Sequence, residues 1–251
     1  MIPKIIHYCW FGRNTLPDSA QKCIASWRKF LPDYDIKEWN EDNFDINMIP
    51  YTREAYEAKK YAFVSDYARL WILYHYGGLY FDTDVEIIKP MGLIIAQGAF
   101  MGIEATSIFN KSIENGEKSF EVNPGLGLGV GPKVELYREL LDYYKDEVFI
   151  HPDGTMNLKT IVTRTTAVLT EHGFNGKNEI QKIGGITIYP HDYFCPMDST
   201  TGITTITERS VSIHHYDCSW LDHNTITFKL HLIKNFMFKL LGKRLVGWIY
   251  R

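Results

Sequence analysis

The sequence contains, at residues 77–88, the stretch Gly77-Gly78-Leu79-Tyr80-Phe81-Asp82-Thr83-Asp84-Val85-Glu86-Ile87-Ile88. Its two glycines are a natural stop for a long helix predicted over residues 53–76, because glycine readily adopts the left-handed backbone that ends a helix. The apolar residues that follow predict a strand over residues 79–88. Side chains alternate between the two faces of a strand, so Asp82 and Asp84 are expected to project to the same side.

The segments on either side of this stretch predict an α/β fold. Residues 4–11 are mostly apolar and indicate a buried strand, residues 19–30 have apolar positions at helical spacing, and residues 35–39 indicate a second strand. This strand–helix–strand order is typical of a central, mostly parallel sheet flanked by helices. Further strands are predicted at residues 98–104, 181–189 and 210–215, and further helices at residues 134–144 and 158–172.

Glycines occupy alternate positions in residues 123–132. A period of two fits a closely approached strand or loop better than a helix. The order of a Walker phosphate-binding loop is missing, so this stretch does not predict one. Glu104, at the end of a predicted strand, is a candidate residue for binding an acceptor, the molecule that receives a transferred group.

Two carboxylates side by side repel each other and need compensation where they are partly buried. A divalent cation such as Mn²⁺ or Mg²⁺ supplies it, since these ions prefer carboxylate oxygens and keep positions open for phosphate. A strand that simply ends in solvated acids is the common alternative for an isolated D-x-D. A second alternative is a phosphatase of the haloacid-dehalogenase type, but its motif has Thr or Val where this chain has Glu86.

The predicted helix before the D-x-D carries a charged pair on a small and apolar face. Asp66 and Arg69 are spaced i,i+3, and Ala62 and Leu73 share their face. A buried ion pair is weak evidence for stability. It is understandable if Arg69 faces a phosphate and Asp66 accepts hydrogen bonds from sugar hydroxyls; a structural salt bridge is the alternative.

In these residues the chain resembles a known family. The segments Ala62-Phe63-Val64-Ser65-Asp66-Tyr67-Ala68-Arg69-Leu70 and 77–84 resemble the S-D-x-x-R and G-G-x-Y-x-D-x-D signature of the DXD glycosyltransferases of family 32. That family includes capsular-polysaccharide sugar transferases and fungal α-mannosyltransferases, and is distantly similar to the clostridial glucosylating toxins. The opening 2–12 and the late segment 212–220 resemble its first strand and its closing motif.

The resemblance implies a GT-A fold and a retaining, metal-dependent transfer of a sugar from a UDP- or GDP-sugar to a glycan or lipid-linked saccharide in surface (capsular) polysaccharide synthesis. It implies that Asp82, Asp84 and Arg69 form the catalytic centre and that Asp84 and Asp82 bind Mn²⁺ (or Mg²⁺). The implied donor-binding residues are Trp10, which would stack on the nucleotide base, Asp66, Arg69, Tyr80, Asp82, Ser219 and Trp220. A non-catalytic nucleotide-sugar-binding protein is the remaining alternative.

The closing motif of the resemblance supplies a third metal ligand. By position this ligand is His215, with His214 as the alternative, and a histidine ligand suits Mn²⁺ better than Mg²⁺. Strand alternation makes the two histidines face opposite ways. Ser219 and Trp220 resemble a loop pair that covers the diphosphate.

Charge divides the chain of 251 residues into two parts. No Asp or Glu follows Asp222, whereas six Lys and Arg do, so the first 222 residues have 27 − 6 = 21 basic against 30 acidic residues, a net charge of −9. We therefore expect a catalytic domain over residues 1–222 and no nucleic-acid partner. The tail over residues 223–251, helical from residue 228, is basic and amphipathic, which suits either contact with an anionic membrane or docking on the body.

The expected location is the cytoplasm, with peripheral contact at the inner face of the plasma membrane. No signal peptide is visible at the N-terminus. The four cysteines form no C-x-x-C pair, so we expect them to be reduced.

Overall fold

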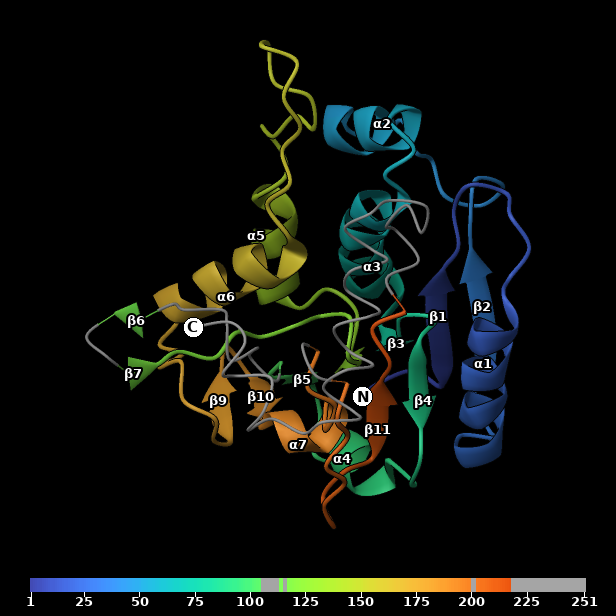
Figure 1. Cartoon of the computed structure of the whole chain (residues 1–251), viewed down its shortest axis with the longest axis vertical. Helices are drawn as coiled ribbons and strands as arrows, with labels where there is room; N and C mark the ends of the chain where they lie inside the picture. The colour runs from blue at the N-terminus through green and yellow to red at the C-terminus, as the bar shows by residue number, and fades with distance from the viewer. Residues whose placement is uncertain (105–112, 115–116, 200–201, 218–251) are drawn as a thin grey trace, which may run out of the picture.

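A computed structural model describes residues 1–104, 113–114, 117–199 and 202–217 of the chain. Its centre is a seven-stranded sheet with the order β2-β1-β3-β8-β5-β10-β9. The pairs β2–β1, β1–β3 and β5–β10 are parallel, and β8 and β9 run antiparallel to their neighbours, so five of the seven strands share one direction. The expected α/β fold with a mostly parallel central sheet flanked by helices is confirmed (Figure 1).

Most strands of this sheet lie within their expected ranges, but the single strand expected over residues 181–189 is two antiparallel strands separated by Gly184 and Gly185. Their bounds are β1 (Ile5–Cys9), β2 (Asp35–Trp39), β3 (Gly78–Tyr80), β5 (Phe100–Gly102), β8 (Leu128–Val130), β9 (Gln181–Ile183) and β10 (Ile186–Tyr189). Two short sheets are separate from it and pair β4 (Val85–Ile87) with β11 (Ser212–His214) and β6 (Ile113–Glu114) with β7 (Glu117–Lys118).

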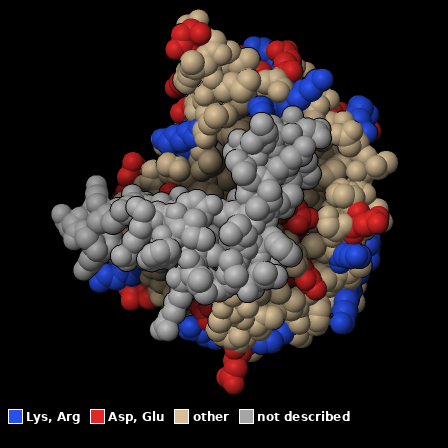
Figure 2. Space-filling view, viewed as in Figure 1, with Lys and Arg blue, Asp and Glu red and all other residues tan. Residues whose placement is uncertain are grey.

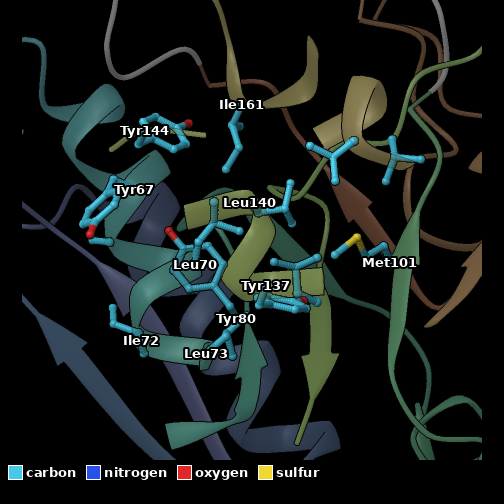
Figure 3. Packing of buried hydrophobic residues seen from close by; sticks show 14 of the residues in the cluster. Tyr67, Leu70, Ile72, Leu73, Tyr80, Met101, Tyr137, Leu140, Tyr144 and Ile161 are labelled. Carbon is cyan, nitrogen blue, oxygen red and sulfur yellow. The ribbon is translucent and has the colours of Figure 1, made fainter. Parts of the chain in front are cut away.

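Helices cover both faces of the central sheet. Their bounds are α1 (Asp18–Phe30), α2 (Pro50–Glu57), α3 (Tyr61–Tyr76), α4 (Gly92–Ala96), α5 (Glu135–Asp142), α6 (Ile161–Glu171) and α7 (His191–Phe194). One core cluster unites α3, α5 and α6 with one face of the sheet, and Figure 3 shows its interior around Leu70, Tyr80 and Tyr137. A second cluster unites α1, α4 and α7 with the other face. Alternation within the strands divides the side chains between the faces: Ile6 joins the second cluster and Cys9 the first.

The helix predicted over residues 53–76 is in fact two helices, and this expectation is wrong. α2 ends at Glu57 and α3 begins at Tyr61, and Lys59 between them has a positive φ of 57°. Lys60 N–H donates to the carbonyl of Ala55 at 2.8 Å, which closes the end of α2. Apolar spacing continues across the break, so the sequence pattern does not reveal it. In Figure 1, α2 runs across the end of α3.

The strand predicted over residues 79–88 is also divided. β3 ends at Tyr80, the chain turns at Thr83 and Asp84, and β4 begins at Val85 in a different sheet. The N–H of Val85 donates to the carbonyl of Asp82 at 3.0 Å within this turn. Strand alternation is therefore the wrong reason for expecting Asp82 and Asp84 to lie together, because the two residues belong to a turn.

Two glycine positions are required by the backbone around them. Gly77 ends α3 with a φ of 64°, as expected, and a Cβ on Gly78 would lie 2.7 Å from the carbonyl oxygen of Ile5 on β1. In the glycine-rich stretch 123–132, a Cβ on Gly129 would lie 2.2 Å from the ring of Phe100 on β5. The expectation of a closely approached strand is confirmed there.

Candidate functional site

The site lies where β3 leaves the central sheet and β4 begins. The indole N–H of Trp27 on α1 donates to the carbonyl of Val85 at 2.7 Å, and the Ser26 hydroxyl accepts from the N–H of Ile87 at 2.9 Å. These bonds attach β4 to α1. β11 runs antiparallel beside β4 (Figure 1), and its register places His214 opposite Val85. A residue from the late part of the chain therefore lies next to the Asp82–Asp84 turn.

Asp82, Asp84 and His214 form a possible metal-binding group. One ligand atom from each residue lies within 4.8 Å of those of the other two. His214 Nε2 lies 3.3 Å from Asp84 Oδ1. Burial raises the pKa of Asp84, an effect that the neighbouring His214 opposes and the negative charge of Asp82 reinforces. Among the described residues, this is the group of Asp, Glu, His and Cys side chains whose ligand atoms lie close enough together to bind one metal ion.

His215 points to a different partner. Its Nε2 lies 2.9 Å from Glu86 Oε2, and its backbone N–H donates to the carbonyl of Asp84 at 3.0 Å. The opposite orientations expected for the two histidines are thus observed. The structure brings His214, the alternative, to the two aspartates, and it places His215 with Glu86.

Arg69 joins the helix motif to the D-x-D turn. Its side chain is 4% exposed, and its Nη2 lies 2.9 Å from Asp66 Oδ1 and 3.2 Å from Asp82 Oδ1. Nη1 donates to the other Asp82 oxygen at 3.3 Å. The expected Asp66–Arg69 pair is present, and Asp82 extends it. Because the sequence contains no direct sign of the Arg69–Asp82 contact, only the packing of α3 against β3 reveals it.

Two further expected site residues lie around Asp82. The Tyr80 hydroxyl donates to Asp82 Oδ1 at 3.0 Å, and the Arg69 guanidinium lies over the Tyr80 ring at 5.0 Å. Asp66 is buried, which raises its pKa to about 6 even though the charge of Arg69 acts in the opposite direction. Asp82 is therefore oriented from two sides by Arg69 and Tyr80.

Trp10 follows β1 at the same edge of the sheet at which Asp82 follows β3. This placement results from the parallel pairing of the two strands, in which His7 lies opposite Tyr80. The indole of Trp10 is half-buried and donates to the carbonyl of Asn14 at 2.7 Å. Ser219, Trp220 and the tail over residues 223–251 lie outside the described residues.

Three residues around the site were given no role from the sequence: Asn123, Gly125 and Tyr216. A Cβ on Gly125 would lie 2.2 Å from Asp82 Oδ2, so the glycine-rich stretch passes directly against the D-x-D turn. Burial raises the pKa of Glu104, and the nearby side chains of His214, Tyr216 and Asn123 act in the opposite direction. The alternating glycines were the one sequence signal that could have pointed to this contact.

The remaining surface features agree with a modestly charged body. On the uncovered part of the face in Figure 2, Lys and Arg are interspersed with Asp and Glu, and no broad basic area is seen among the residues described there. Cys9, Cys23 and Cys195 are buried. Within the described ranges, every helix is too short or too polar to cross a bilayer.

Comparison with known proteins gives a family match over residues 17–101, to the glycosyltransferase sugar-binding region containing the DXD motif. Inositol phosphoceramide mannosyltransferase 1 of Schizosaccharomyces pombe is 30% identical over 111 residues, which cover 40% of this chain and 33% of that protein. The uncharacterized glycosyltransferase L373 of Acanthamoeba polyphaga mimivirus is 34% identical over 106 residues, which cover 40% of this chain and 42% of that protein. Mannosyl phosphorylinositol ceramide synthase CSH1 of Saccharomyces cerevisiae is 34% identical over 109 residues, covering 40% and 28%.

The chain thus matches well under half of the length of these curated relatives. Among solved structures, the PaToxG glycosyltransferase has a TM-score of 0.47 at 18% identity, covering 68% of this chain and 69% of that one. A glycosyltransferase involved in the glycosylation of the major capsid of PBCV-1 has a TM-score of 0.46 at 13% identity, covering 84% and 93%. The family match is the stronger finding, and it includes the turn and the helix that build the site. Residues 17–101, which carry Arg69, Asp82 and Asp84, therefore match the glycosyltransferase sugar-binding region containing the DXD motif.

Proposed function

We propose that this protein is a metal-dependent glycosyltransferase that moves a sugar from a nucleotide-sugar to a glycan or lipid-linked saccharide. One observation carries the proposal: the atoms of Asp82, Asp84 and His214 converge within 4.8 Å, beside Arg69, in a chain with a glycosyltransferase family match. The turn within the matched residues supplies the carboxylates of Asp82 and Asp84, and His214, outside the matched residues, supplies an imidazole. Such oxygen and nitrogen ligands suit a divalent cation that binds a diphosphate.

The residues present fit a divalent cation. Asp66 and Asp82 share the guanidinium of Arg69, and the Asp84 carboxylate lies close to Asp82 and His214. Three carboxyl groups thus gather around one permanently charged cation, and buried negative charge needs a positive partner. The Nδ1 atom of His214 is buried and has no hydrogen-bond partner among the described residues. Two carboxylates and one imidazole form a donor set that suits Mn²⁺ better than Mg²⁺.

A divalent cation held by Asp82, Asp84 and His214 would stabilise the charge of the leaving diphosphate. The protein's own groups would prepare for it. Arg69 holds both oxygens of Asp82, so the carboxylate is oriented before donor arrives. We further propose that Arg69 adds positive charge near the diphosphate, that Asp66 binds sugar hydroxyls, and that Trp10 stacks on the base.

The donor and acceptor are proposals that rest on resemblance. The fungal relatives include an inositol phosphoceramide mannosyltransferase and a mannosyl phosphorylinositol ceramide synthase, so GDP-mannose is the first donor to test, followed by other UDP- and GDP-sugars. Retention of the anomeric configuration, a lipid-linked acceptor and peripheral membrane contact through residues 228–251 complete the proposal.

The test measures nucleoside diphosphate release from a panel of UDP- and GDP-sugars with Mn²⁺, with and without a chelator. We expect turnover of one donor that the chelator stops and that Asp84→Asn abolishes while the circular dichroism spectrum is unchanged. Full activity of D84N together with indifference to the chelator would refute the metal centre. Phosphate release from simple esters would indicate a phosphatase, and donor binding without transfer or hydrolysis would indicate a binding protein.

The two adjacent histidines provide a matched pair for the third ligand. His214→Ala removes the imidazole that lies 3.3 Å from Asp84, whereas His215→Ala removes the one that contacts Glu86. Manganese binding, measured by electron paramagnetic resonance, should weaken strongly in H214A and stay near the unsubstituted value in H215A. The reverse ranking would assign the ligand to His215.

A further inference from the structure

The end of β11 and the residues after it contact three atoms of Asp84. His214 Nε2 lies 3.3 Å from Asp84 Oδ1. The backbone N–H of His215 donates to the carbonyl of Asp84 at 3.0 Å, and the backbone N–H of Asp217 donates to Asp84 Oδ2 at 3.0 Å. Hydrogen bonds from a backbone N–H to a carboxylate are among the stronger ones in proteins. The orientation of the Asp84 carboxylate therefore depends on the path of residues 215–217.

This path includes an uncommon backbone conformation at Tyr216. Its φ is 53°, in the left-handed region that residues other than glycine rarely adopt. Tyr216 lies between His215 and Asp217, so its conformation is part of the path that brings both of their N–H groups to Asp84. A strained conformation of this kind persists only where the surrounding contacts hold it. The contacts of the Tyr216 side chain are therefore the ones to consider.

The Tyr216 side chain joins the hydrophobic core to His214. Its hydroxyl lies 2.8 Å from Cys195 Sγ, and the Cys195 thiol donates to the carbonyl of Met197 at 3.6 Å, which leaves the sulfur to accept from the hydroxyl. Cys195 directly follows α7, is 0% exposed and belongs to the second core cluster, on which Tyr216 packs. The Tyr216 ring meets the His214 ring edge-on, with centroids 4.3 Å apart and an interplanar angle of 79°. The core contact therefore fixes a ring that lies against His214.

We infer that Tyr216 is a positioning residue that holds the His214 ring and the Asp84 carboxylate in place for a cation, through its contact with Cys195. The inference rests on the proposed metal centre and goes beyond it, since Tyr216 lies outside the D-x-D turn and outside the family match. The Tyr216 hydroxyl is directed to the Cys195 sulfur, so its action on a cation is indirect. Residues that orient metal ligands commonly control metal affinity by about 10- to 100-fold.

The test is the affinity of the whole chain for Mn²⁺, measured by electron paramagnetic resonance with the metal alone. Tyr216→Phe deletes only the hydroxyl that contacts Cys195 and keeps the ring against His214. We expect its dissociation constant for Mn²⁺ to rise about tenfold. Cys195→Ala removes the other partner of the contact and should weaken Mn²⁺ binding in the same direction. Cys195→Ser keeps a group that accepts from the hydroxyl, so it should retain most of the affinity.

Two further variants separate positioning from a general effect on packing. Tyr193→Phe is the matched control, because it deletes a hydroxyl from α7, where the Tyr193 ring packs on Tyr189 and Phe194. It should bind Mn²⁺ as the unsubstituted protein does. The double variant Y216F/C195A should weaken Mn²⁺ binding less than the two single effects combined, because both substitutions break the same contact.

Unchanged Mn²⁺ affinity in Y216F and C195A overturns the inference and leaves the metal centre intact, even if the melting temperature of either variant falls. Equal weakening in Y216F and Y193F overturns it in favour of a general packing effect. Equal weakening in C195A and C195S also overturns it, because the contact between the hydroxyl and residue 195 would then have no part in metal binding. No Mn²⁺ binding by the unsubstituted protein refutes the metal centre and the inference together.

Discussion

His7 on β1 should make the stability of this protein depend on pH below neutrality. Its ring is 1% exposed, its Nδ1 accepts a hydrogen bond from the Trp39 indole at 3.0 Å, and its Nε2 lies 3.0 Å from the carbonyl of Gly77. These two contacts require a neutral His7 ring with its single proton on Nε2, because Nδ1 accepts a hydrogen bond and Nε2 donates one. A second proton on Nδ1 would face the indole N–H and break that bond. Burial accordingly lowers the pKa of His7 from 6.5 to about 4, although the bond to Gly77 acts in the opposite direction.

The size of the effect follows from this difference. A separation of about 2.5 pH units at about 1.4 kcal/mol per unit corresponds to roughly 3 kcal/mol of unfolding free energy. The folded pKa lies below the unfolded one, so the unfolded chain binds the proton first as pH falls. The contribution is therefore complete above pH 6.5, declines through the interval down to about pH 4, and is lost below it.

Urea unfolding of the unsubstituted protein and of His7→Gln between pH 7.5 and pH 4.5 measures this contribution. The other titrating groups are common to both proteins, so the difference in unfolding free energy isolates His7. We expect the advantage of the unsubstituted protein to shrink by about 1.4 kcal/mol for each pH unit below 6.5. A difference that stays constant across this range would show that His7 is not buried in its neutral form.

Three further substitutions test the packing around the site. Arg69→Met leaves the two carboxylates bound to its guanidinium without a cation, and its unfolding free energy should fall by about 3–5 kcal/mol in chemical denaturation; a loss below 1 kcal/mol would contradict the buried ion-pair network. Gly125→Ala places a Cβ 2.2 Å from Asp82 Oδ2, so Mn²⁺ affinity should fall while the melting temperature changes little; unaltered affinity would mean that this turn does not support Asp82. Gly129→Ala places a Cβ 2.2 Å from the Phe100 ring, so its unfolding free energy should fall by about 1–3 kcal/mol while its Mn²⁺ affinity is retained. A variant as stable as the unsubstituted protein would contradict the close packing of these two strands.

The sequence pattern predicted helices and strands correctly where interactions between neighbouring residues determine the structure. The strand predicted over residues 35–39 coincides with β2, and the helix over residues 19–30 differs from α1 by one residue. Gly77 ends α3 because a left-handed backbone favours glycine, and this property is visible in the sequence. Apolar periodicity and glycine conformation act within a few neighbouring residues, so no tertiary contact is needed to predict them.

Pattern failed where the chain changes direction inside an apolar run. Helical spacing continues through residues 58–60 and alternation continues through residues 81–84, yet the chain breaks at both places. Each break lets the following element pack on a different part of the core. Where the following element packs depends on surfaces contributed by residues far away in the sequence. The spacing of apolar residues within one segment carries no information about those surfaces.

The sequence by itself determined that a pair of carboxylates, Asp82 and Asp84, follows a helix bearing the Asp66–Arg69 pair, and that His214 and His215 face opposite ways. The tertiary structure decided which histidine meets the aspartates, because the antiparallel register of β11 with β4 sets His214 opposite Val85. It also placed Arg69 on Asp82 and the glycine-rich turn beneath it. Such contacts join segments far apart in the chain, and their distances are set by how the sheet and helices pack rather than by any spacing along the sequence.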